Sequence, residues 1–168
     1  SGTAWVQIGT DVAGEAINDQ SGWRVSLSRD GSTVAIGARL NDGNGNEAGH
    51  VRVFSLDITP PTIAISSDVS SLKAGETATL TFTLSEASSN FVQSDVTVSG
   101  GTLSNWNAAS ATSYSATFTP TADSTTNAVI SVASSKFSDA AGNTNNDGSD
   151  DNNSVPLSVD PVRPTFQS

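Results

Sequence analysis

The chain has 168 residues and a net charge of −10, from 17 Asp and Glu against 7 Lys and Arg. This charge repels nucleic-acid phosphates and anionic lipid headgroups, so we expect no nucleic-acid partner and no membrane insertion, and it favours cations as ligands. The sequence contains no cysteine, which excludes disulfides, thiolate zinc sites and a cysteine nucleophile.

Residues 1–56 predict a small antiparallel sheet. Alternating apolar and polar residues place candidate strands at Trp5–Ile8, Arg24–Ser28, Thr33–Gly37 and His50–Phe54. Asp30-Gly31 separates two of these runs and is a hairpin signal, because glycine tolerates positive φ. Three or four short antiparallel strands in a segment of this length are typical of one propeller blade.

Motifs spread over residues 4–55 carry a family resemblance. They are Trp5-x-Gln7-x-Gly9, Gly14-Glu15-Ala16, Ser21-Gly22, Val25-Ser26-Leu27-Ser28, Asp30-Gly31, Val34-Ala35-Ile36-Gly37-Ala38, Asn41-Asp42-Gly43-Asn44-Gly45 and Gly49-His50-Val51-Arg52-Val53. Together they resemble the FG-GAP-like propeller repeats of large bacterial secreted proteins. The resemblance implies that residues 1–56 form one blade-type repeat. A single blade cannot bury both faces of its sheet, so we expect this one to pack against another element.

Residues 57–160 predict a β-sandwich. The candidate strands are Thr62–Ser66, Thr77–Leu84, Asp95–Val98, Gly101–Trp106, Ser113–Thr119, Ala128–Ala133 and Val155–Val159. Short strands separated by turn residues in this number are typical of immunoglobulin-like folds. The sequence therefore predicts an all-β chain, an Ig-like β-sandwich preceded by a small antiparallel blade-like β-sheet. The prolines of Asp57–Pro61 predict a semi-rigid linker between them.

The second segment also carries a resemblance, which covers residues 57–160. Its motifs are Asp57-Ile-Thr-Pro-Pro-Thr62, Leu72-Lys73-Ala74-Gly75-Glu76-Thr77, Phe82-Thr83-Leu84-Ser85-Glu86, Phe91, Asp95-Val-Thr-Val-Ser-Gly-Gly101, Tyr114-x-Ala116-x-Phe118-Thr119-Pro120 and Phe137-Ser-Asp-Ala-Ala-Gly-Asn143. It resembles the bacterial Ig-like domains repeated in giant RTX and biofilm-type adhesins.

An internal repeat is consistent with tandem domains. The Asp-x-x-x-Pro-Thr pattern of Asp57–Thr62 recurs at Asp160–Thr165, at an offset of 103 residues. This offset equals one Ig-like domain and its linker, so residues 161–168 are expected to begin the next linker or repeat. A chance match of this short pattern is the alternative.

The run from Asp139 to Asn153 is the strongest chemical signal, because it is rich in carboxylates and amides and contains no cationic side chain. Calcium binds six to eight hard oxygen ligands of these kinds. Asn143, Asn145 and Asp147 match positions one, three and five of an EF-hand-type loop, and Asp151 matches position nine. Ser154 stands at position twelve, where a bidentate Glu is expected. We predict an EF-like calcium turn or a looser cage here; the alternative is a solvated polar loop.

The resemblance to tandem Ig-like adhesins implies a second calcium site near the linker. It assigns ligand roles to Asp57, Glu86, Asp95 and Asp139; ordinary surface solubility is the alternative for each. The loop Asn41–Glu47 is expected to be a glycine-rich turn in preference to a cation site. Each of Trp5, Trp23 and Trp106 is expected in a core, with a carbohydrate platform as the alternative.

The expected function is non-catalytic. His50 is the sole histidine, and the sequence pairs it with no Ser or Cys in the manner of a catalytic triad. We therefore predict that the chain is not an enzyme. We expect a calcium-stabilised extender module of a large secreted bacterial cell-surface adhesin, with Ca²⁺ as cofactor. The expected partners are neighbouring tandem domains and host or biofilm surface ligands. The alternative is a carbohydrate-binding or other ligand-binding accessory module of a secreted multidomain protein or enzyme.

Overall fold

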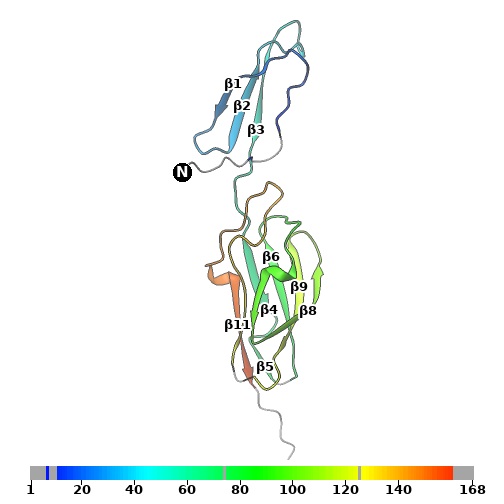
Figure 1. Cartoon of the computed structure of the whole chain (residues 1–168), viewed down its shortest axis with the longest axis vertical. Helices are drawn as coiled ribbons and strands as arrows, with labels where there is room; N and C mark the ends of the chain where they lie inside the picture. The colour runs from blue at the N-terminus through cyan, green and yellow to red at the C-terminus, as the bar shows by residue number, and fades with distance from the viewer. Residues whose placement is uncertain (1–6, 8–10, 74, 125, 161–168) are drawn as a thin grey trace, which may run out of the picture. The chain divides into compact units, whose positions relative to one another are not determined.

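The computed structural model describes residue 7 and residues 11–73, 75–124 and 126–160. Within these residues the chain is built from β-strands and contains no α-helix, so the predicted all-β class is confirmed. The chain divides into two compact units, Ser1–Thr59 and Pro60–Ser168 (Figure 1).

Among its described residues, the first unit contains a single antiparallel sheet. Its strands are β1 (Ser21–Leu27), β2 (Thr33–Ala38) and β3 (His50–Ser55), in the order β1-β2-β3. The hairpin predicted at Asp30-Gly31 joins β1 to β2, and Gly31 has the positive φ of 80° that such a turn requires. Of the predicted strand Trp5–Ile8, only Gln7 lies among the described residues.

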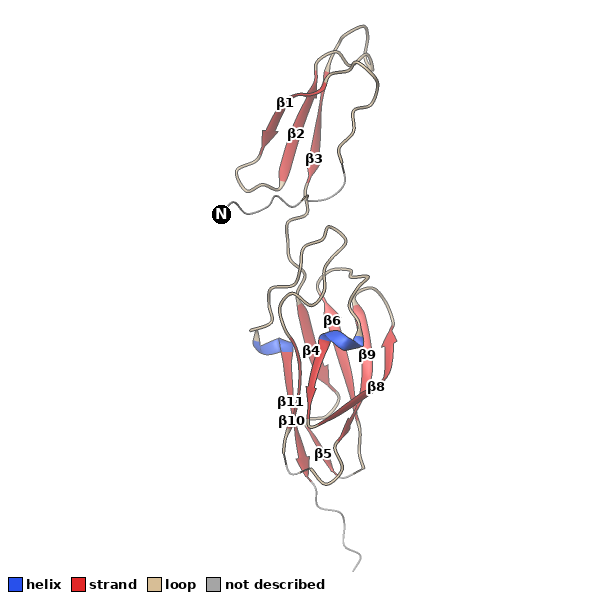
Figure 2. Cartoon of the chain, in the orientation of Figure 1, coloured by secondary structure: helices blue, strands red, loops and turns tan. Residues whose placement is uncertain are grey.

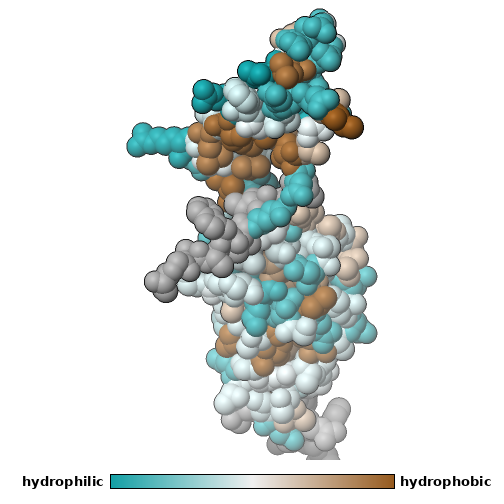
Figure 3. Space-filling model, turned by 45° about the horizontal axis from the view of Figure 1, so that its top comes forward, coloured by the Kyte–Doolittle hydropathy of each residue, from teal (hydrophilic) through white to brown (hydrophobic). Residues whose placement is uncertain are grey.

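This sheet exposes many apolar side chains because no second layer is described against it. Val25 is 61% exposed, Leu27 59%, Val51 67% and Val53 66%. Hydrophobic side chains accordingly gather on the surface of this unit in Figure 3. Trp23 is 55% exposed, with the Arg39 guanidinium 4.3 Å from its ring centroid. Core packing of Trp23 was therefore a wrong prediction, since its strand lies at the edge of a one-layer sheet.

The second unit is a sandwich of two four-stranded sheets (Figure 2). One sheet has the order β4-β6-β9-β8, comprising β4 (Ile63–Ser67), β6 (Ala78–Leu84), β9 (Ser113–Pro120) and β8 (Gly101–Ala108). The other has the order β5-β11-β10-β7, comprising β5 (Ser71–Lys73), β11 (Ser154–Asp160), β10 (Ala128–Val132) and β7 (Val96–Ser99). Two short 3₁₀ turns, η1 (Gln93–Asp95) and η2 (Asp151–Asn153), precede β7 and β11.

All seven predicted strands of the sandwich are present, with ends shifted by a residue or two. The sequence pattern missed β5, which is only three residues long and buries a single side chain, Leu72. β5 pairs in parallel with β11, so its partner is distant in sequence and no hairpin signal marks it.

The sandwich core follows from the alternation of the strands. In β6, Leu80, Phe82 and Leu84 are buried whereas the residues between them are more exposed. Phe91 lies at the centre of an aromatic cluster and makes edge contacts with Phe82, Trp106, Tyr114 and Phe137, at centroid distances of 5.0 to 6.0 Å. Trp106 is thus partly buried and packed against the core, as predicted.

Candidate metal centre

Three carboxylates come together around the entry to the sandwich. Asp57 lies in the segment that leads into β4, Glu86 follows the end of β6, and Asp139 lies in the loop after β10. Each supplies one oxygen, and these three oxygens lie within 4.8 Å of one another. Asp57 is exposed, Glu86 is half-buried and Asp139 is buried. This acidic cluster has the composition to bind a metal ion.

The spacing of these oxygens allows a single metal ion of calcium's size. Ca²⁺ takes oxygen ligands at roughly 2.3–2.6 Å, so two ligands on opposite sides of the ion lie at most about 5 Å apart. Oxygens within 4.8 Å of one another therefore fit around a single ion. Because calcium needs six to eight oxygens, the remaining ligands would be second carboxylate oxygens, backbone carbonyls or water.

The loop around Asp139 holds its carboxylate in place. Oδ1 accepts hydrogen bonds from the backbone N–H groups of Gly142 (2.8 Å) and Asn143 (2.9 Å), and Oδ2 accepts one from Nδ2 of Asn143 (2.8 Å). Gly142 has φ of 95°, which favours glycine and lets the loop fold back on Asp139. Burial opposes ionisation of Asp139, but the hydrogen bonds from Asn143 and Gly142 outweigh it and lower the pKa. Asp139 is therefore a charged, oriented carboxylate at neutral pH and a candidate metal ligand.

Asn143 thus has a positioning role toward Asp139. Asn145, by contrast, is fully buried and organises its own loop: its Oδ1 accepts N–H groups of Lys136 and Phe137, at 2.8 and 3.2 Å. Its Nδ2 donates to the carbonyl of Ala133 and to Oδ1 of Asp147. The amide oxygen predicted as a calcium ligand is therefore engaged with the backbone.

Asp147 connects this loop to the opposite sheet. Its Oδ2 accepts the backbone N–H of Ile63 at 2.6 Å, across 84 positions of sequence, and its side chain is buried. Asp151 lies exposed in η2. Neither Asp147 nor Asp151 belongs to the acidic cluster found among the described residues. An EF-like ion site in residues 143–151 stays a prediction.

Asp95 has a different local role. Its Oδ2 accepts the backbone N–H of Val92 at 2.9 Å, which caps η1. The acidic cluster of the described residues does not include it. Of the four linker-site residues implied by the family resemblance, the structure therefore brings three together.

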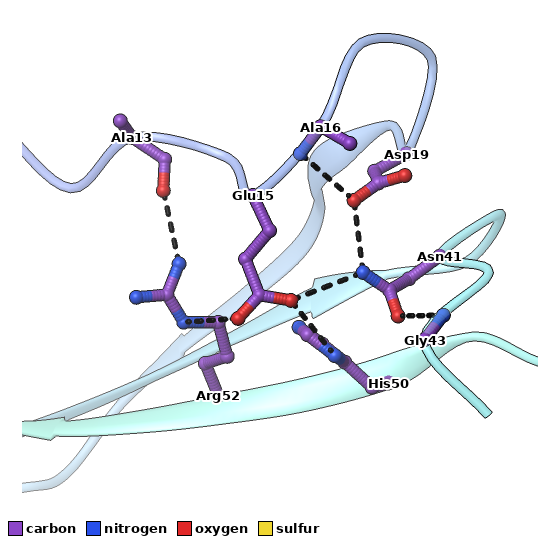
Figure 4. A network of polar contacts seen from close by, with 8 residues as sticks. All are labelled: Ala13, Glu15, Ala16, Asp19, Asn41, Gly43, His50 and Arg52. Atoms are coloured by element: carbon purple, nitrogen blue, oxygen red, sulfur yellow. Dashed lines mark hydrogen bonds and ion pairs between the residues drawn. The ribbon is translucent and has the colours of Figure 1, made fainter.

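A polar network in the first unit was missed by sequence reasoning (Figure 4). Nδ2 of Asn41 donates to Oε2 of Glu15 (3.1 Å) and Oδ2 of Asp19 (2.8 Å), while its Oδ1 accepts the N–H of Gly43 (3.0 Å). His50 and Arg52 flank the same Glu15 carboxylate at 3.4 and 3.8 Å. The contacts fasten the segment before β1 to β3 and the loop after β2.

This network explains the role of Asn41 and His50. The Asn41 amide, held by Gly43, presents its hydrogens to the two carboxylates, so it acts as a donor there and not as a cation ligand. His50 has an ion-pair neighbour in Glu15, which ties β3 to the segment before β1. No local motif signals the network, because its partners lie 22 and 26 positions apart in sequence.

The two units correspond to two known domain types. The fold of the second unit defines an immunoglobulin-like β-sandwich, and that of the first a single blade-like sheet. A family model described as bacterial Ig-like domain matches residues 57–155, so the chain belongs to this family. A model described as FG-GAP repeat matches residues 11–54. Both are non-enzymatic domain types and fit a non-catalytic extracellular module.

The other comparisons add no relative. No curated protein and no solved structure matches the chain. A search of the described residues for a helix with the length and apolar character of a membrane span finds none.

Proposed function

We propose that the chain is a calcium-stabilised structural module of a large bacterial cell-surface adhesin, exported from the cell. The observation that carries this proposal is the convergence of oxygens from Asp57, Glu86 and Asp139 within 4.8 Å. Three like charges at this spacing repel one another, and a divalent cation converts that repulsion into attraction. Membership of the bacterial Ig-like family supports the extracellular, non-catalytic part of the proposal.

Calcium at this cluster would tie three separate loops of the chain to one ion. Asp57 lies beside Pro60 and Pro61, whose fixed φ already limits the backbone. An ion bound there would restrict the leading segment further, which is the property that an extender between tandem neighbours needs. The partners proposed on this basis are neighbouring domains of the same adhesin and the surface ligands that such an adhesin reaches.

Thermal unfolding in chelator and in millimolar calcium tests the proposal. A ligand that binds only the folded state stabilises it by about 2.7 kcal/mol at a free concentration one hundred times its Kd. We expect the sandwich transition to move upward by several degrees in calcium, and less in magnesium, which prefers a smaller octahedral site. An unchanged melting temperature in saturating calcium would refute calcium stabilisation.

A pair of variants locates the ion. Glu86→Gln removes a charge from the cluster, and Asp151→Asn removes one from the exposed η2 turn of the EF-like loop. Both lower the net negative charge equally. We expect Glu86→Gln to abolish most of the calcium-induced shift and Asp151→Asn to retain it. The reverse result would move the site to residues 143–151, and equal effects would indicate nonspecific screening.

A further inference from the structure

The segment that enters the sandwich is divided between its two sheets. β4 pairs with β6 in one sheet, and β5, which follows after residues 68–70, pairs with β11 in the other. The β5–β11 pairing is parallel, with Ser71 opposite Ser158 and Lys73 opposite Asp160. This pairing therefore joins the segment by which the chain enters the sandwich to the strand by which it leaves, at the opposite end (Figure 2).

The parallel direction decides how a pull along the chain acts on this pairing. A pull on the entering segment reaches β5 through its N-terminal end, by way of β4, whereas a pull on the leaving segment reaches β11 through its C-terminal end. Because the two strands run in the same direction, these pulls are opposed and lie along the strands. The bonds across the pairing are therefore strained together, in shear, and do not open one at a time. β4 is strained in the same sense against β6, but its loss would release only the segment before β5.

We propose that the β5–β11 pairing (Ser71–Lys73 with Ser158–Asp160) is a mechanical clamp, the set of contacts that limits how fast the sandwich opens under tension. The inference rests on the proposed role of the chain as an extender, since a module between tandem neighbours transmits tension from one to the next.

The side chains of the clamp oppose sliding of one strand past the other. Leu72 is only 2% exposed, and Val159, opposite it, packs against the core of the sandwich. Because side chains alternate between the two faces of a strand, a slip of one residue cannot restore the pairing without turning Leu72 out of the core. The N–H of Ser158 also donates to the carbonyl of Ser70 at 3.1 Å, which extends the clamp by one hydrogen bond.

Unfolding of the full chain at constant force, held by its two ends in chelator, tests the proposal. Ser158→Pro removes the N–H that donates to Ser70, and it removes no core side chain because Ser158 is exposed. Thr102→Pro is the matched control, since Thr102 is an exposed residue of β8, at the edge of the other sheet. We expect Ser158→Pro to raise the unfolding rate of the sandwich about fivefold, and Thr102→Pro to change it less than about twofold.

A second pair of variants avoids proline. Val159→Ala and Val155→Ala shorten the same side chain on the same strand, and both valines are partly buried against the core. Only Val159 lies where β11 pairs with β5, whereas Val155 lies opposite Ile130 of β10. We expect similar losses of stability in urea, but a larger acceleration of unfolding under force for Val159→Ala, by about threefold.

The sandwich event is recognised by its length, because about 100 residues extend to about 350 Å. Equal acceleration by the two members of either pair, or greater acceleration by Thr102→Pro or Val155→Ala, would overturn the clamp. Because the measurement is made in chelator, a failed clamp would leave the calcium-induced melting shift standing. A failed calcium site would likewise leave the clamp standing.

Discussion

The two units of the chain use the same strand patterns with opposite results. In the sandwich, alternation buries one residue set between two sheets, and Leu80, Phe82 and Phe118 have no exposed surface. In the first unit, equally regular alternation leaves Val25 and Val53 more than 60% exposed. The buried side chains described there are Asp19, Ala38 and Asn41, so polar contacts replace an apolar core. Alternation therefore predicts strands, whereas the presence of a second layer decides whether they have a core.

The largest effect that would sharpen this comparison comes from truncating a core aromatic. Phe82→Ala removes a fully buried ring that contacts Phe91 and Trp106, and it should destabilise the sandwich by about 3–5 kcal/mol. Val53→Ala on the exposed sheet should change stability by less than about 0.5 kcal/mol. Urea unfolding followed by region-resolved amide hydrogen exchange measures both. Similar losses of stability from Phe82→Ala and Val53→Ala would contradict the difference in core packing between the two units.

The next effect concerns a polar group that behaves as part of the sandwich core. Asp147→Asn replaces an oxygen that accepts from Nδ2 of Asn145 with an amide hydrogen donor, or else loses the 2.6 Å bond from the N–H of Ile63. Either choice leaves a buried group poorly paired, so we expect a loss of about 1.5–3 kcal/mol in chelator.

Asp150→Asn is the matched control for this change, because it removes the same charge from an exposed position of the same loop. Urea unfolding of both variants in chelator separates the buried contact from the charge. Equal stability of the Asp147 and Asp150 variants would show that the bond to Ile63 contributes nothing measurable.

These two cases also mark what the sequence could and could not predict. The strands of both units follow from period-two alternation, which is local. The contact of Asp147 with Ile63 spans 84 positions, and no short pattern encodes it. The EF-like spacing assigned Asn145 to a metal, whereas a fully buried amide must first satisfy its own hydrogen bonds, and the nearest donors were backbone N–H groups.

The residues of the acidic cluster were predicted from the family resemblance and not from residue spacing. The family resemblance named Asp57, Glu86, Asp95 and Asp139 together, and the structure gathers oxygens of all of these but Asp95. Charge patterning alone would not select the three clustered residues. Asp95 is an equally suitable metal ligand by residue type, but its carboxylate accepts a local backbone N–H at η1 instead. Proximity in space is set by loop paths that residue spacing does not determine.

A smaller effect tests the single tyrosine of the core. The hydroxyl of Tyr114 donates to the carbonyl of Ser88 at 3.0 Å, so Tyr114→Phe should cost about 1 kcal/mol while the ring contacts with Phe91 and Trp106 remain. Burial raises the pKa of Tyr114 above its ordinary value of 10.0. The buried, protonated hydroxyl of Tyr114 therefore contributes stability that is complete below pH 10. That stability is lost as the pH rises through the folded-state pKa of Tyr114.

Ultraviolet titration of the wild type reads out this pKa directly, because the chain has only one tyrosine. Normal titration at pH 10 would contradict the burial of the phenol in the folded state. Unfolding of Tyr114→Phe measures the hydrogen bond separately.

The smallest expected effect returns to the exposed sheet, at the β1–β2 turn. Asp30 accepts hydrogen bonds from the hydroxyl of Ser28, from the backbone N–H of Ser32 and from the hydroxyl of Ser32. The bond from the Ser28 side chain, followed by those from Ser32, lowers the pKa of Asp30 to about 2 from its ordinary 3.8. Because the folded-state pKa of Asp30 is depressed, the ionised carboxylate contributes to the stability of the turn above about pH 4. That contribution disappears as the pH falls towards 2. NMR titration of the Asp30 carboxyl measures this pKa, and Ser28→Ala and Ser32→Ala are expected to raise it.

Because the Asp30 carboxyl is fully exposed, the turn would keep its hairpin geometry through Gly31 even when Asp30 is protonated. Loss of the β1–β2 pairing at pH 3 would mean that a surface hydrogen-bond turn, and not the alternating strands, holds this one-layer sheet together.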